Sequence, residues 1–161
     1  MEALRKLYEN LGYQHVKTYL QSGNVVFKAP SSENEIAQKI SRRIKTEYGF
    51  EVPVIVLTLD ELEKIIENNP FSNDPEKDPS ALYVTFLATQ PAIFDPKTIE
   101  DKKRKEEEIH FADNAVYLYC PKGYGVTKLS NTFLESKLMV TATTRNWKST
   151  NAIFKLAEPL N

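Results

Sequence analysis

The sequence predicts an α+β fold with antiparallel sheets, arranged as two similar halves. The first observation is a β-hairpin at residues 17–28, where Gln21-Ser22-Gly23-Asn24 joins two runs of β-branched and aromatic residues. The glycine can take the positive φ that a tight turn requires. A second hairpin signal, Ile109 to Cys120, recurs in the other half. Each hairpin is followed by a polar loop and a helix, so the two halves share one plan.

Composition sets broad limits on function. The 161 residues can form one domain or two small ones, and 41% hydrophobic with 27% charged residues is typical of a soluble globular protein. Lysine plus arginine (21) nearly balance aspartate plus glutamate (22), so no overall field attracts nucleic acid or a membrane, although local patches remain open. The absence of an 18-residue apolar run and of a signal-peptide pattern argues against a membrane span and secretion. The single cysteine, Cys120, cannot form an internal disulfide, so a cytoplasmic location is expected.

The first half opens with a helix that ends at Gly12, because apolar residues recur at helical spacing before a glycine that suits a left-handed C-cap. These apolar residues are Leu4, Leu7, Tyr8 and Leu11. After the hairpin, Ser32 and Glu35 form a capping box that starts a second helix, which ends at Gly49. Its buried stripe consists of Ile36, Ile40 and Ile44.

Residues 53–57 are nearly all apolar, which predicts a strand covered on both faces. Thr58 and Glu61 form another capping box, which predicts a short helix after this strand. Its inward residues are Leu62, Ile65 and Ile66.

Three prolines and several turn formers in residues 68–79 indicate the boundary between the halves. We therefore expect an N-terminal subdomain at residues 1–70, a linker at 71–80 and a C-terminal subdomain at 81–161.

The second half begins with a strand at residues 82–87, followed by a charged helix from Pro96 to about Glu107. Its run of both charge signs at residues 101–108 is interpreted as a solvated face. In the second hairpin, one face carries Val116, Leu118 and Cys120 and the other carries Ala115, Tyr117 and Tyr119. The next helix carries Leu129, Phe133, Leu134 and Leu138.

The chain closes with a weak strand near Val140 and a last helix from Arg145 to about Ala157, capped by Thr144. The second half thus has the order strand, helix, strand, strand, helix, strand, which is the ferredoxin-like pattern. The first half fits this pattern if a leading strand is missing. The fold class predicted is α+β with two ferredoxin-like subdomains.

Four ordered motifs resemble the bacterial proteins called the domain of unknown function 1697 family. They are Tyr19 to Phe27, Asn69-Pro70-Phe71, Pro121-x-Gly123-x-Gly125 with Lys128-Leu129, and Thr143 to Trp147. The resemblance implies two ferredoxin-like subdomains and no established activity. Family members usually begin with a strand and an Arg-Gly-Ile-Asn-Val-Gly-Gly-like loop, which this chain is expected to lack. The loss of a central strand leaves unpaired edges, so we expect a homodimer through exposed strand edges or a rearranged N-terminal half.

The segment Thr144-Arg145-Asn146-Trp147 is the first candidate site. The Arg145 guanidinium can hold a carboxylate or phosphate through two hydrogen bonds, and the Trp147 ring can stack on a base. The alternative is a capped helix start with a buried tryptophan and an arginine that bonds backbone carbonyls.

The loop from Lys122 to Lys128, with Gly123 and Gly125, is the second candidate. Backbone amides and two lysines before a helix can hold a phosphate or another anion. The loop is neither a Walker A loop nor a full dinucleotide fingerprint, and the alternative is a glycine turn between strand and helix.

The hairpin tip is the third candidate, since Gln21, Ser22 and Asn24 can bind a polar ligand, although turns favour these residues for backbone reasons alone. Tyr117 and Tyr119, with Tyr83 alongside, form an aromatic stripe of the kind that stacks RNA bases. Packing of this stripe under helices is the favoured alternative.

No metal site, cofactor or catalytic residue is assigned. His15 and His110 lack a cluster at metal-ligand spacing, and Cys120 is expected to be a buried, inert thiol. The leading functional hypothesis is a non-enzymatic binding module for a small anionic ligand or a nucleic-acid segment. The alternatives are an enzyme with a pocket between the halves and a protein-interaction or assembly module.

Overall fold

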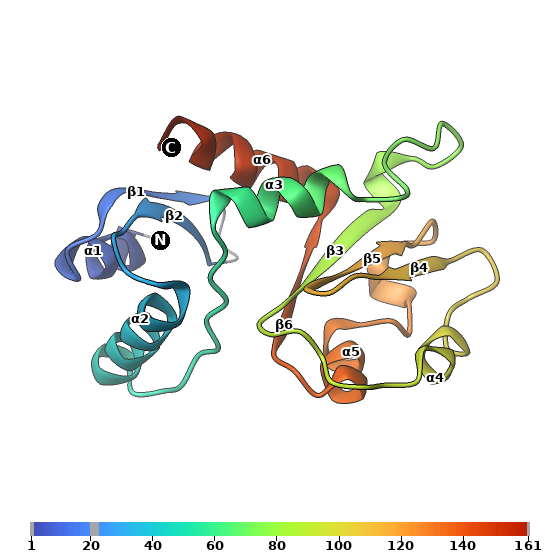
Figure 1. The fold of residues 1–161 in the computed structure, drawn as a ribbon, viewed down its shortest axis with the longest axis horizontal. Coiled ribbons are helices and arrows are strands. Elements are labelled where there is room, and N and C mark those ends of the chain that lie inside the picture. The colour runs from blue at the N-terminus through green and yellow to red at the C-terminus, as the bar shows by residue number, and fades with distance from the viewer. Residues whose placement is uncertain (1, 20–22, 161) are drawn as a thin grey trace. The chain divides into compact units, whose positions relative to one another are not determined.

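A computed structural model describes residues 2–19 and 23–160 of the chain (Figure 1). The chain divides into two compact units. Unit 1 consists of Met1–Glu63 together with Asn151–Asn161, and unit 2 consists of Lys64–Thr150. Residues 71–80, which we expected as a linker, belong to unit 2. Mixed helices and antiparallel sheets confirm the predicted α+β class.

Unit 1 contains a two-stranded antiparallel sheet and the helices that cover it. Its elements are α1 (Glu2–Asn10), β1 (Gln14–Tyr19), β2 (Asn24–Lys28), α2 (Glu33–Tyr48), the first part of α3 (Leu59–Glu67), the last part of α6 (Trp147–Ala157) and η3 (Glu158–Leu160). The strands pair from Gln14 opposite Lys28 to Tyr19 opposite Asn24, with an irregularity between Gln14 and Lys17. The buried core consists of Leu7, Tyr8, Tyr13, Val16, Ile36, Ile40 and Ile44.

The predicted helix ends in unit 1 are confirmed. Gly12 and Gly49 have φ of 91° and 79°, the left-handed conformation that glycine adopts without strain. The Ser32 hydroxyl accepts from the amide of Glu35 at the start of α2. At α3, the Thr58 amide donates to Glu61 Oε1 at 2.9 Å and the Glu61 amide donates to Thr58 Oγ1 at 3.1 Å, which is a reciprocal capping box.

The strand predicted at residues 53–57 is wrong. Residues 51–58 belong to no helix or strand, although Val52, Val54 and Val56 pack against the unit 1 core. Within the described residues, no backbone–backbone hydrogen bond involves residues 52–57, and β2 pairs with β1 alone. The apolar pattern therefore fixes side-chain burial, but a strand also requires a neighbouring backbone to pair with.

Unit 2 contains a four-stranded antiparallel sheet in the order β4-β5-β3-β6. Its elements are η1 (Pro79–Ala81), β3 (Leu82–Leu87), α4 (Pro96–Glu100), β4 (Glu108–Phe111), β5 (Ala115–Tyr119), η2 (Tyr124–Val126), α5 (Asn131–Leu138) and β6 (Ala142–Asn146). The strands and helices alternate in the order expected for this half. Its core consists of Leu87, Ile99, Val116, Leu118, Cys120, Leu129, Leu134, Leu138 and Ala142.

The aromatic stripe predicted on one face of this sheet is partly wrong. Tyr83 lies opposite Leu118 in the β3–β5 register, so it shares the face of Leu118, whereas Tyr117 and Tyr119 lie on the other face. Tyr117 is buried, and its hydroxyl donates to the backbone carbonyl of Ile65 at 2.7 Å. Tyr117 therefore packs beneath α3, as the favoured alternative expected.

Two helix boundaries in unit 2 differ from prediction. Helix α4 ends at Glu100, well before Glu107. The last helix starts at Trp147, because Thr144 lies in β6 opposite Thr85 of β3. The cap of α6 is supplied by Asn146, whose Oδ1 accepts from the amide of Ser149 at 2.7 Å. None of the helices in residues 2–19 and 23–160 is both long and apolar enough to cross a membrane.

Candidate functional site

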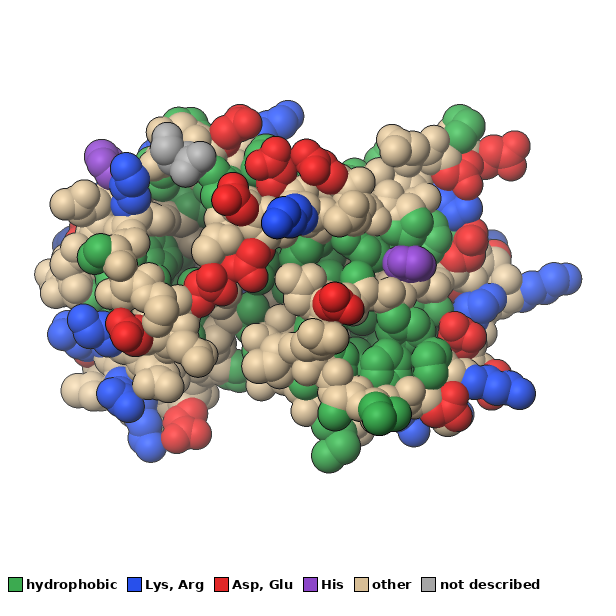
Figure 2. Space-filling model, viewed as in Figure 1, with side chains coloured by type: hydrophobic (Ala, Val, Ile, Leu, Met, Phe, Trp, Pro, Cys, Tyr) green, Lys and Arg blue, Asp and Glu red, His purple; other side chains and the backbone are tan. Residues whose placement is uncertain are grey.

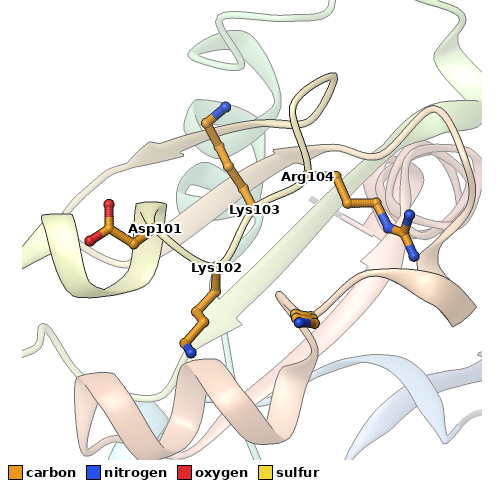
Figure 3. A pocket seen from close by; sticks show the side chains of 5 residues that line it. Asp101, Lys102, Lys103 and Arg104 are labelled. Carbon is orange, nitrogen blue, oxygen red and sulfur yellow. The ribbon is translucent and has the colours of Figure 1, made fainter.

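A hollow lined by basic side chains lies on unit 2, where the turn after α4 meets the loop after β5 (Figure 3). Its volume is about 380 Å³. We call it the basic hollow, and its lining residues are Asp101, Lys102, Lys103, Arg104 and Lys128. Four basic residues and one acidic residue therefore line this space.

The turn that carries Lys102, Lys103 and Arg104 follows α4, where the backbone hydrogen bonds change from the α-helical spacing to the tighter 3-10 spacing. The amide of Asp101 donates to the Lys97 carbonyl at 2.9 Å, and the amide of Lys102 donates to the Ile99 carbonyl at 3.0 Å. Figure 3 shows Lys102 and Lys103 extending to opposite sides of this turn. The side chains thus differ in direction although they are adjacent in the sequence.

Arg104 extends from the turn toward the loop after β5 (Figure 3). Its Nε and Nη2 atoms donate to the Val126 carbonyl at 3.4 and 3.2 Å. Val126 precedes Lys128 by two residues, so this contact joins the two walls of the basic hollow.

The four cations of the basic hollow outnumber Asp101, the one carboxylate in its lining. Within the described part of the chain, none of its four cationic side chains forms an ion pair. Figure 2 shows lysine and arginine side chains projecting at the edge of unit 2 beside the α4–β4 connection. Lys102, Arg104 and Lys128 are exposed, so water and salt screen their attraction for an anion.

Glu107 lies behind the turn and is fully buried. Its Oε1 accepts from the Arg104 amide at 2.8 Å, and its own amide donates to the Arg104 carbonyl at 3.0 Å. Its Oε2 has no hydrogen-bond partner among the residues described. Burial, followed by the charge of Glu107, raises the pKa of the neighbouring Cys120 thiol to about 12, which disfavours the reactive thiolate.

The structure brings one of the residues predicted in the glycine loop to the basic hollow. Lys128 lines it, whereas Lys122, Gly123 and Gly125 do not. Gly123 has a φ of 98°, which only glycine adopts readily, and it starts the turn of η2. The loop therefore acts as a glycine turn that also presents one cation.

The segment Thr144 to Trp147 lies away from the lining of the basic hollow, and its polar groups bond within the fold. The Thr144 hydroxyl is 2.8 Å from Thr85 Oγ1 and donates to Asn131 Oδ1 at 2.9 Å. Arg145 Nη1 donates to the Thr143 hydroxyl at 2.6 Å and to the Thr144 carbonyl at 3.0 Å. Burial lowers the pKa of the Arg145 guanidinium.

The third candidate, the hairpin tip, is described only in part. Gln21 and Ser22 lie outside the described residues. Asn24 donates from its side-chain amide to the Tyr19 carbonyl at 3.1 Å, which links the two hairpin strands. No group of three or more metal-ligating side chains occurs in the ranges 2–19 and 23–160.

The sequence did not single out Lys102, Lys103, Arg104 or Glu107. All four fall in the charged run of residues 101–108, which we interpreted as a solvated helical face. The available signal was the position of Glu107 immediately before a strand, where alternation can turn a side chain inward.

Comparisons with known proteins agree with this fold. A family model described as "Protein of unknown function (DUF1697)" matches residues 1–117. The conserved bacterial protein SP0830 from Streptococcus pneumoniae has a similar structure, with a TM-score of 0.69 and 24% sequence identity. The match covers 98% of this chain and 88% of that chain. No curated protein matches. Because the family model covers well over half of the sequence, the resemblance is confirmed and the chain belongs to the DUF1697 family of proteins of unknown function.

Proposed function

We propose that the protein is a non-enzymatic binding module for a small anionic ligand, and that the basic hollow is its binding site. The observation that carries this proposal is that four basic residues line one hollow and form no ion pair within the described residues. Such a cluster attracts anions, and a bound anion reduces the repulsion among the four positive charges.

The size and chemistry of the basic hollow favour a phosphorylated small molecule. Its volume of about 380 Å³ lies within the range of about 300–1,000 Å³ typical of small-molecule sites. Three of the four cations are lysines, which bind phosphate as point charges. Because the side chains are exposed, we expect modest affinity that falls steeply with added salt.

A nucleic-acid segment is a less favoured ligand. Base stacking requires an accessible aromatic face, and Tyr117 is buried with its hydroxyl bonded to Ile65.

A buried free thiol, Cys120, suits the reducing cytoplasm in which we place the protein.

Titration calorimetry with pyrophosphate and with ATP at low ionic strength tests the proposal. We expect Lys128→Ala to weaken binding several-fold, whereas Lys122→Ala, a matched change at an exposed loop lysine outside the basic hollow, leaves it unchanged. Equal effects of the two substitutions would show that only general charge matters. Loss of binding in Arg145→Ala with Lys128→Ala unaffected would move the site to the segment Thr144 to Trp147.

A second candidate function is assembly through unpaired strand edges. It is supported by the unpaired outer edge of β2 and by the apolar residues 52–57, which form no backbone–backbone hydrogen bond within the described residues. We expect a dimer in light scattering after size exclusion, and a monomer after Ile55→Lys. A wild-type monomer at all accessible concentrations would refute this candidate.

A further inference from the structure

We propose that the buried carboxylate of Glu107 is a positioning residue for the basic hollow. It holds the turn that carries Arg104 against the loop that carries Lys128, so that an anion bound in the hollow also keeps this loop closed over Cys120. This inference rests on the proposed anion-binding function.

The first argument is the pair of hydrogen bonds between Glu107 and the backbone of Arg104. Oε1 accepts from the Arg104 amide at 2.8 Å and the Glu107 amide donates to the Arg104 carbonyl at 3.0 Å. The carboxylate is fully buried, where its hydrogen bonds are not exchanged with water. The backbone of Arg104 is thereby fixed by a group that does not itself line the hollow.

The second argument is that Arg104 transmits this fixed position to the opposite wall. Its guanidinium donates twice to the Val126 carbonyl, at 3.4 and 3.2 Å. The following residue, Thr127, is buried, and its hydroxyl accepts from the Leu129 amide at 3.1 Å. The loop around Lys128 is therefore fixed by its own Thr127–Leu129 bond, and the Arg104–Val126 contact holds it against the turn.

The third argument is the arrangement behind this loop. Cys120 is fully buried in the apolar core of unit 2, and Glu107 and Thr127 are both near enough to its thiol to shift the thiol pKa. The turn and the loop that form the hollow therefore lie beside this part of the core. Because the chain has one cysteine, its reaction with a thiol reagent reports on opening of this part of the core.

Substitutions at Glu107 and at its exposed neighbour Glu106 test the inference, because the two residues carry the same charge and differ in burial. The probe is pyrophosphate, measured by calorimetry. We expect Glu107→Leu to lose about tenfold in affinity, as is typical when a supporting residue behind a site is removed. Glu107→Gln keeps an oxygen acceptor for the Arg104 amide, so it should stay within about threefold of wild type. Glu106→Leu should bind as wild type does.

Labelling of Cys120 by a disulfide reagent supplies a second readout, and the free energy of unfolding of each variant, measured by urea denaturation, separates opening of the loop from unfolding of the whole fold. In wild type, pyrophosphate should slow labelling, whereas in Glu107→Leu labelling should be fast with or without pyrophosphate. Glu107→Gln and Glu107→Leu should both lower the thiol pKa, because the charge that raises it is gone in both, so opening of the loop is read from labelling that is faster in Glu107→Leu than in Glu107→Gln.

The outcomes separate the two proposals. If wild type does not bind pyrophosphate, the proposed function fails, and the positioning role is then decided by labelling in the absence of anion. Equal labelling rates in wild type and Glu107→Leu, or equal affinities, overturn the inference. If Glu107→Leu does not fold, Arg104→Lys replaces it, since lysine keeps the charge but lacks the paired contact to Val126. Unchanged affinity and labelling in that variant also overturn the inference.

Discussion

The hydroxyl of Tyr117 should stabilise the fold through one hydrogen bond, and Tyr117→Phe removes it without removing the ring. The bond to the Ile65 carbonyl is 2.7 Å long, and Tyr117 is 1% exposed. Ile65 lies in the last turn of α3, where carbonyls lack an amide four residues ahead. Amides of Asn68 and Asn69 reach the carbonyls of Lys64 and Ile66, which leaves the Ile65 carbonyl to Tyr117.

The substitution should therefore leave a buried acceptor without a donor. The cost of an unsatisfied buried group is about 1–3 kcal/mol, while phenylalanine keeps the apolar burial of the ring. For a chain of this length, each kcal/mol lowers the melting temperature by about 2–4 °C. We expect the free energy of unfolding to fall by about 1–3 kcal/mol, with the denaturant dependence unchanged.

Urea denaturation of wild type, Tyr117→Phe and Tyr119→Phe measures this effect. Tyr119 is a matched control, because its ring is half-buried beneath the Lys77 ammonium, 5.0 Å from the ring centre. The control should change stability by less than about 0.5 kcal/mol. Equal changes in the two variants would show that the Ile65 carbonyl does not depend on Tyr117, and the reasoning would be wrong.

Three further predictions concern other parts of the fold. Burial raises the pKa of Tyr8, Tyr117 and Cys120 to about 12 from ordinary values of 10 and 9, so the folded chain holds protons that the unfolded chain releases. The free energy of unfolding should have its full value below about pH 9. Between about pH 9 and pH 12 it should decrease by as much as about 1.4 kcal/mol per pH unit for each group, and the decrease should be shallower in Cys120→Ser. Thr58→Ala should cost about 1 kcal/mol in thermal denaturation by removing the α3 cap, and Thr58→Ser should restore it. Thr144→Val should cost about 1–3 kcal/mol by leaving the buried Thr85 hydroxyl without this partner, and Thr144→Ser should not.

Local features of the fold could be predicted from the sequence because their causes lie within a few residues. Ser32 and Thr58 start helices through bonds to amides three residues away, and Gly49 ends one because glycine tolerates a positive φ. The β4–β5 hairpin follows from its alternation and central turn.

The remaining features depend on what lies next to each residue in space. Residues 53–57 have the composition of a strand, but pairing needs a second backbone that composition does not specify. The face of the sheet on which Tyr83 lies depends on the β3–β5 register, which the sequence of one strand does not specify. The basic hollow is lined by residues 101–104 and by Lys128, which are far apart in the sequence and meet only in the folded chain. The burial of Glu107 could not be predicted either, because its immediate neighbours in the sequence are all charged.

Unit 1 is built from two separate stretches of the chain, and this has a consequence for synthesis on the ribosome. Unit 2 is one continuous stretch, so it can close its core as soon as Thr150 has emerged. Unit 1 includes Asn151–Asn161, which are synthesised after the whole of unit 2. Its buried core comes from residues 7–44, so α1 and α2 can pack against the β1–β2 hairpin early, and the C-terminal segment joins unit 1 last.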